Sequence, residues 1–164
     1  MDSYIKNVKI SLFLKRNLFA VEKSREKIFH RLQNLHLTIY KHSPSLINIT
    51  GIKSLNLISE SILLVENFFN VEHSRYDINC IMISFKSSQK IRLRMIQNVL
   101  NMFSNHYRCE FHPELFSGAI LKSDIYPTIL LFHTASFQIF GKRIDHLEYA
   151  FELAQRLSNH LEVV

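Results

Sequence analysis

Two stretches of the chain are typical of β-strands, because apolar and polar positions alternate along them or apolar side chains dominate them. The first stretch covers residues 4–12, and its alternating positions are Asn7, Val8, Lys9, Ile10, Ser11 and Leu12. The second covers residues 76–84 and is apolar on both faces apart from Asn79 and Ser84. Since an asparagine stands at the same early place in both, the chain is predicted to contain an internal duplication.

Each of these strands is followed by a stretch with helical periodicity. The first has apolar positions on one side at Leu18, Val21, Ile28, Phe29 and Leu32, and the second at Ile91, Met95, Val99, Leu100 and Phe103. Each copy then reaches a β-type run that ends in a glycine, over 46–51 and 137–141. A long amphipathic helix is predicted after each glycine, roughly over Ser54–Phe69 and Ile144–Leu161.

The two copies predict an α+β fold, in which an antiparallel sheet carries the helices on one face. We place the first half-repeat at residues 1–74 and the second at 75–164, together forming one domain. Asn7 and Gly51 are 44 positions apart, whereas Asn79 and Gly141 are 62 apart, which makes the first copy 18 residues shorter. That difference predicts the loss of about two strands from the first repeat.

The bulk composition favours a single soluble, intracellular domain with negatively charged partners. The chain has 164 residues and is 47% hydrophobic, with a formal net charge of +6 and a pI near 9.4. No apolar run is long enough to span a bilayer, and polar residues interrupt the N-terminus before a signal peptide could form, so no membrane partner is expected. The positive charge favours nucleic acid as a partner, but any polyanion would satisfy it.

Neither a metal centre nor a catalytic site is predicted. The two cysteines, Cys80 and Cys109, and the nine histidines show no spacing that is typical of zinc ligands. The sequence has no nucleophile elbow and no phosphate-binding glycine loop, and Asp145 and Glu148 form only a surface pair on one helix. We therefore expect no enzyme activity, no metal and no cofactor.

The segment from Phe111 to Ile120 carries the most specific motif in the chain. It reads Phe-His-Pro-Glu-Leu-Phe-Ser-Gly-Ala-Ile. It resembles the stirrup motif in the second repeat of TATA-binding proteins (TBPs), where an aromatic residue precedes Glu-Pro-Glu-Leu-Phe-Pro-Gly and an apolar strand. The chain departs from that pattern at His112 and Ser117.

Further similarity to the TBP family extends over residues 76–158 in order. The segment 91–93 with Phe103 resembles the short helix of the family's second repeat, and residues 127–131 resemble its apolar strand after a proline. Residues 148–152 resemble its C-terminal helix. In the first half the resemblance rests on Asn7, on residues 50–54 and on the order of the helices.

The resemblance implies a TBP-like saddle, with a curved antiparallel sheet and the helices on its convex face. It also implies binding to the minor groove of A/T-rich double-stranded DNA, which family members kink with phenylalanine wedges. Carried over to this chain, the implied DNA-binding residues are Asn7, Asn79, Ile81, Phe116, Phe132 and His133. Phe116 matches one wedge, and the position of the second falls at His133 with Phe132 beside it.

Glu114 and Leu115 match the family surface that recruits a TFIIB-like factor, so this factor or RNA polymerase subunits are implied as partners. The 18 missing residues fall where the family has its first stirrup and wedge, so we expect weak or partner-dependent DNA binding. A heterodimer could supply the absent half.

The expected function is that of a transcription-initiation factor, in the nucleus or at the site of viral transcription. The alternative is a TBP-fold interaction subunit that no longer binds DNA by itself. The richness in Asn, Ile, Lys and Phe is compatible with a virus or a fast-evolving lineage.

Overall fold

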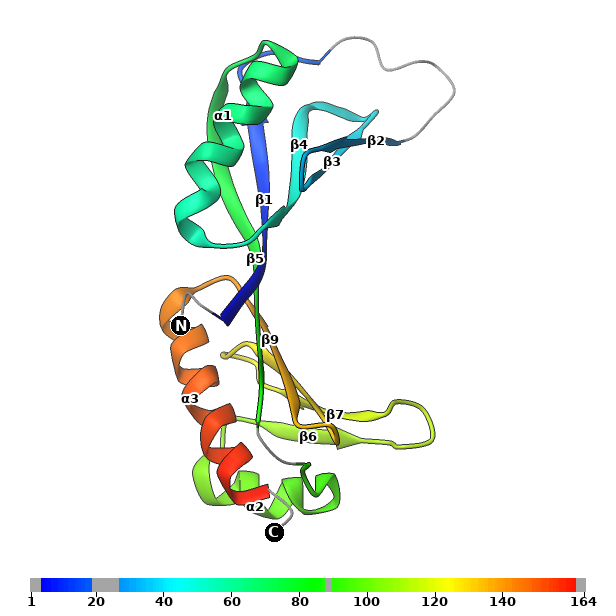
Figure 1. Ribbon diagram of the computed structural model, residues 1–164, viewed down its shortest axis with the longest axis vertical. Helices are drawn as coiled ribbons and strands as arrows, with labels where there is room; N and C mark the ends of the chain where they lie inside the picture. Colours follow the sequence, from blue (N-terminus) through cyan, green and yellow to red (C-terminus); the bar gives the residue numbers. More distant parts are fainter. Residues whose placement is uncertain (1–3, 19–26, 88–89, 162–164) are drawn as a thin grey trace. The chain divides into compact units, whose positions relative to one another are not determined.

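The computed structural model describes residues 4–18, 27–87 and 90–161 (Figure 1). It divides into an N-terminal unit, Asp2–Ile81, and a C-terminal unit, Met82–Val164. The boundary lies later than the one predicted after residue 74 and falls inside strand β5 (His73–Lys86). This strand neighbours β1 on one side and β9 on the other, which is why it is shared between the units. None of the described helices is long and apolar enough to cross a membrane.

The N-terminal unit consists of an antiparallel sheet and one long helix. Its strands pair in the order β2-β3-β4-β1-β5. The new elements are β1 (Ile5–Leu14), β2 (Lys27–Leu32), β3 (Leu35–Tyr40), β4 (Ser43–Ile52) and α1 (Ile58–Phe69). The helix buries Ile58, Ile62 and Val65, and Val8, Ile10 and Leu12 of β1 are buried as the alternation predicts.

The C-terminal unit repeats this plan with two helices. Its strands pair in the order β5-β9-β8-β7-β6. The elements are α2 (Ile96–Phe103), β6 (Arg108–Phe111), β7 (Gly118–Lys122), β8 (Thr128–Phe132), β9 (Ser136–Gly141) and α3 (Ile144–Leu161). Phe137 is completely buried, stacked on Phe85 with ring centroids 4.6 Å apart, and Phe151 of α3 packs edge-on against Phe85.

The two strand orders correspond, with one exception. Read outward from β1 and β5, the strands β4, β3 and β2 match β9, β8 and β7, and only β6 lacks a counterpart. The α+β fold with two repeats is confirmed, but the expected loss of two strands from the first repeat is wrong: among the described residues, it lacks one strand.

The helix predicted between Leu18 and Leu32 is also incorrect where it can be compared. Residues 27–32 form β2, whose partner is β3 in full antiparallel register. The side chains of Ile28, His30 and Leu32 alternate with exposed ones, which is a period of two rather than the helical period. The remainder of that prediction, including Val21, lies outside the described residues.

Asn7 and Gly51 meet at a β-bulge in the N-terminal unit. Between Val8 and Ile10, β1 spans two steps while β4 spans three, from Ile52 to Ile49. Gly51 adopts a positive φ of 99° there, and its N–H donates to the Asn7 side-chain oxygen at 2.8 Å. The asparagine therefore stabilises the bulge that ends the β-run of the first repeat.

Candidate nucleic-acid interface

One face of the C-terminal sheet is packed under helices, and the other is open. On the covered face, Ala119, Leu121, Ile129, Leu131, Phe137 and Ile139 are completely buried. The alternate positions of the same strands are half-buried and form what we call the C-terminal open face, whose central residues are Ile120, Leu130, Phe132, Gln138 and Phe140. Because four of these five side chains are apolar and none carries a charge, this face can press against a flat, uncharged surface such as stacked base pairs.

The charged side chains lie at the margin of this face. Lys122 of β7 donates to Glu110 of β6 at 2.7 Å, and Arg108 stands opposite Lys122 in the β6–β7 pairing. The hydrogen bond from Lys122 lowers the pKa of the Glu110 carboxyl, with the charges of Lys122, Arg108 and His112 adding to the effect. The exposed Arg108 and the half-buried Lys122 thus accompany one carboxylate at the margin, which favours a polyanion weakly.

Phe116 and Phe132 form an aromatic pair at one end of the C-terminal open face. Their ring centroids are 5.5 Å apart in an edge-on arrangement, and both side chains are half-exposed. Gly118 faces Phe132 across β7 and β8, and a Cβ there would lie 2.9 Å from Phe116 and 3.0 Å from Phe132. The glycine therefore leaves the space in which the two rings meet.

His133 does not join this pair. Its side chain is exposed, its carbonyl accepts the Ile91 N–H, and it lines a hollow with Met95 and Phe111. The strand β8 ends at Phe132, and His133 belongs to the turn that follows it. Phe132, rather than His133, is therefore the neighbour of Phe116.

The corresponding face of the N-terminal unit is polar. The Ser11 hydroxyl donates to the side-chain oxygen of Asn48 at 2.6 Å, and the Asn79 amide donates to Ser11, also at 2.6 Å. Lys9 is exposed on the same strand as Ser11. Thr38 pairs with Asn48 across β3 and β4. We call this surface the N-terminal open face. It carries charge and hydrogen-bonded polar groups where the C-terminal open face is apolar.

Strand registers identify Tyr40 as the counterpart of Phe132. Ile39 faces Ile47 in β4 as Leu131 faces Phe137 in β9, and Tyr40 and Phe132 are the residues that follow. The Lys27 ammonium lies 5.3 Å from the centre of the Tyr40 ring, near enough for a cation–π contact. The His42 ring also lies 5.5 Å from the Tyr40 ring. The N-terminal unit thus places a cation and a histidine ring beside the aromatic residue, where the C-terminal unit places a phenylalanine.

The three predicted DNA-binding residues of β1 and β5 have different surroundings. The Asn7 oxygen is occupied by Gly51, which leaves its amide nitrogen to serve as a donor, and no acceptor among the described residues takes it up. Asn79 donates one of its two amide hydrogens to the Ser11 hydroxyl oxygen. Ile81 is 0% exposed, so its side chain offers no surface for the predicted DNA contact.

Glu114 and Leu115 stand at the tip of the loop between β6 and β7. The N–H groups of Leu115 and Phe116 both donate to the His112 carbonyl at 2.9 Å, which folds the loop into a compact turn. Leu115 is 83% exposed, and the carboxylate of Glu114 lies 3.9 Å from the His112 ring. An apolar side chain so fully exposed beside a charge is what a protein partner can bury.

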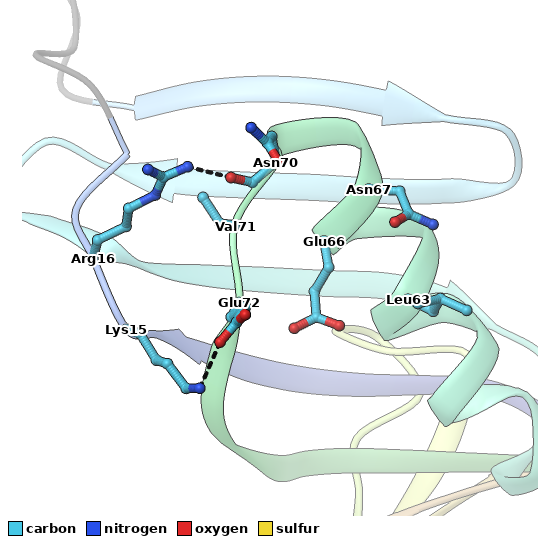
Figure 2. Close-up of a pocket in the computed structure, with 8 residues that line it drawn as sticks. All are labelled: Lys15, Arg16, Leu63, Glu66, Asn67, Asn70, Val71 and Glu72. Carbon is cyan, nitrogen blue, oxygen red and sulfur yellow. Dashed lines mark hydrogen bonds and ion pairs between the residues drawn. The ribbon is translucent and has the colours of Figure 1, made fainter.

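A pocket of the N-terminal unit lies elsewhere, at the C-terminal end of α1 (Figure 2). It measures about 650 Å³, and its charged groups are already paired: Lys15 bonds Glu72 at 2.6 Å, and Glu66 accepts from the His73 backbone and ring. The His73 hydrogen bonds lower the pKa of Glu66. Contacts within the protein thus satisfy the charged groups of Lys15, Glu66 and Glu72.

The surroundings of Cys109 and the distribution of potential metal ligands bear on two further kinds of chemistry. Burial raises the pKa of the Cys109 thiol, and the nearby Glu110 charge adds to this, which disfavours the reactive thiolate. Within residues 4–18, 27–87 and 90–161, no three His, Cys, Asp or Glu side chains gather as a metal site would require.

Sequence reasoning missed Ile120, Leu130 and Phe140, which form much of the C-terminal open face. The signal was present, since all three fall in short apolar runs where both faces of a strand are hydrophobic. When helices cover one face of such a strand, the apolar side chains of its other face have no partner within the sheet. An uncovered apolar surface of this kind indicates an interface.

No protein-family model matches this chain, and no curated protein matches it by sequence. Among solved structures, the chain is similar to the TBP of Methanococcus jannaschii, with a TM-score of 0.68 and 17% sequence identity. The match covers 96% of this chain and 98% of the archaeal one. Nearly complete coverage at such low identity shows a shared architecture: the chain has the α+β fold of a TATA-binding protein.

Proposed function

We propose that this protein is a TBP-like transcription-initiation factor that contacts A/T-rich double-stranded DNA through its C-terminal open face. The observation that carries the proposal is the Phe116–Phe132 pair at the end of an apolar, uncharged sheet surface. The TBP fold supports a role of this general kind. We further propose that Glu114 and Leu115 recruit a TFIIB-like factor or RNA polymerase subunits, in the nucleus or at a site of viral transcription.

The geometry suits a wedge mechanism. Two adjacent rings at the edge of a flat apolar face can enter a base step and unstack it, at a cost of roughly a few kcal/mol. Contact between the bent groove and the side chains of Leu130 and Phe140 would offset that cost. Asn7 and Asn79 still have amide hydrogens to donate, and the minor groove of A/T pairs presents only acceptors.

DNA binding by the isolated protein is expected to be weak. The N-terminal open face presents Lys9 and the Ser11–Asn48 hydrogen bond instead of an apolar surface, and the neighbours of Tyr40 are the Lys27 ammonium and the polar His42 ring instead of a phenylalanine. We expect a Kd for an A/T-rich duplex no tighter than micromolar at physiological salt. A fluorescence anisotropy titration measures this, and nanomolar binding accompanied by a large bend would contradict it.

The wedge itself can be tested at concentrations that saturate the wild-type protein. Replacing Phe116 and Phe132 by alanine is expected to weaken binding to A/T-rich DNA by about tenfold or more, since stacking on an aromatic ring contributes about 1–3 kcal/mol. The DNA bend should also be lost, which energy transfer between dyes at the two duplex ends measures. Phe68→Ala is the matched control, because Phe68 is 52% exposed but lies on α1. Equal losses in both variants would refute the wedge.

The alternative function is a TBP-fold subunit that binds only proteins. The charged and hydrogen-bonded N-terminal open face favours it, because burying Lys9 against bases without a phosphate partner is costly. The two functions separate in one measurement: chemical footprinting on promoter DNA with and without the native transcription machinery. If no stretch of promoter DNA is protected by this protein itself in either condition, the result favours the alternative.

A further inference from the structure

The outer edge of β2 is the place where the two repeats differ most. In the C-terminal unit, β7 is flanked by β8 on one side and β6 on the other. In the N-terminal unit, β2 is flanked by β3, and none of the described residues pairs with its outer edge. Such an edge presents unpaired N–H and C=O groups to any extended chain that can reach it.

Strand registers show which β2 residues match the paired stretch of β7. His30 faces Leu37 as Leu121 faces Ile129, and Leu37 and Ile129 in turn face the matching residues Ile49 and Ile139. On this alignment, β2 residues 28–31 match β7 residues 119–122. The latter are the residues that pair with β6, so the length of the unpaired edge is that of the missing strand.

The burial of these side chains shows what covers them in one unit and not in the other. Ala119 and Leu121 are completely buried, and α2 lies against their outer neighbour β6. Their counterparts Ile28 and His30 are only half-buried. His30 packs edge-on against Phe69 and against Phe68, which is itself 52% exposed. An apolar strip therefore remains on the covered side of the β2 edge.

The opposite side of this edge carries charge. Phe29 is 73% exposed, and the exposed residues Lys27 and Arg31 flank it on the same face. Arg31 matches Lys122, which bonds Glu110 of β6 at 2.7 Å. Arg31 has only a long hydrogen bond, 3.4 Å, to the Gln33 carbonyl. The carboxylate that β6 supplies in the C-terminal unit thus has no equivalent among the described residues here.

We propose that the edge of β2 binds an extended segment of a partner protein, which adds to the sheet in the place that β6 takes in the second repeat and that none of the described residues takes in the first. Backbone pairing along residues 28–31 would hold the segment. Its apolar side chains would cover Ile28, His30 and Phe68, and its acidic side chains would face Lys27 and Arg31. The proposal goes beyond DNA binding and does not depend on it, because none of these β2 residues is a proposed DNA contact.

A peptide derived from β6 is a suitable probe. It comprises residues 106–113 with Arg108→Glu and Cys109→Ser, so that two carboxylates lie on one face. A control peptide keeps Arg108 and carries Glu110→Lys and Cys109→Ser. Using the full chain, we expect the acidic peptide to slow hydrogen exchange of the β2 amides and to bind at least about tenfold tighter than the control in anisotropy titrations.

A charge reversal in the protein completes the test. Arg31→Glu is expected to reverse the preference between the two peptides, whereas Arg156→Glu, at an exposed position of α3, should leave it unchanged. The proposal is overturned if millimolar peptide adds no protection to residues 28–31, or if the preference survives Arg31→Glu. It is equally overturned if the free protein already protects β2 as well as β7, since other residues of the chain or a second copy would then occupy the edge.

Discussion

Gly51→Ala is expected to destabilise the protein by about 3 kcal/mol or more, which corresponds to a fall in Tm on the order of 10 °C. Gly51 has a φ of +99°, a conformation that side-chain-bearing residues rarely adopt. In addition, a Cβ at this position would lie 2.2 Å from the backbone oxygen of Asn34, and backbone atoms cannot move aside as a flexible side chain can. Differential scanning calorimetry measures the change directly.

Gly141→Ala is the matched control, because Gly141 ends the equivalent β-run of the second repeat. Its φ is not in the positive region, and an added Cβ would meet side-chain atoms of Pro127 at 2.7 Å and Leu147 at 3.1 Å. We expect a smaller loss there, about 1–2 kcal/mol from overpacking. Similar losses for the two alanine variants would show that the bulge at Gly51 is not the strained feature inferred here.

The double substitution Glu114→Arg with Leu115→Ala is expected to abolish recruitment of the proposed TFIIB-like factor or polymerase. Removing a side chain at the centre of an interface costs about 2 kcal/mol or more, which lowers affinity about 30-fold. Leu115 is 83% exposed at the loop tip, so its removal costs the free protein little. Co-purification from the native cell, followed by quantitative mass spectrometry, measures the loss of the partner.

Two comparisons keep that experiment specific. Leu63→Ala removes another exposed leucine, 56% exposed on α1, and should leave recovery of the partner unchanged. The variant with alanine at Phe116 and Phe132 should bind DNA less tightly, but it should still recover a partner that is bound by the loop tip alone. Undiminished recovery of the initiation machinery with Glu114 and Leu115 both replaced would count against the assignment of this loop.

Most of the fold could be predicted from local patterns. The alternation around Val8 and Ile10 predicted β1, and the helical period after Gly141 predicted α3 with its observed bounds. The error between Leu18 and Leu32 arose because Ile28 and Leu32 fit a helical spacing as well as a strand spacing. Pairing of residues 27–32 with β3 decides for the strand, and that information lies in a different segment of the chain.

The candidate site was only partly predictable for a related reason. Phe116, Glu114 and Leu115 belong to one contiguous motif, so a local resemblance could locate them. The neighbour of Phe116 depends on which face of β8 each side chain occupies, and one residue of slip exchanges Phe132 for His133. Burial of Ile81 likewise depends on packing from residues distant in sequence.

The sequence by itself determined the two-repeat α+β plan, the stirrup motif and the shortening of the first copy, because strand period, helix period and glycine turns are local properties of a chain. Only the tertiary structure decided that Phe132 meets Phe116 and that the second repeat has an apolar open face while the first has a polar one. It also decided that the described part of the first repeat has one strand fewer than the second, rather than two. These features depend on register and pairing between segments far apart along the chain. The outer edge of β2 is the clearest case, because the sequence of β2 cannot show that none of the described residues pairs with this edge.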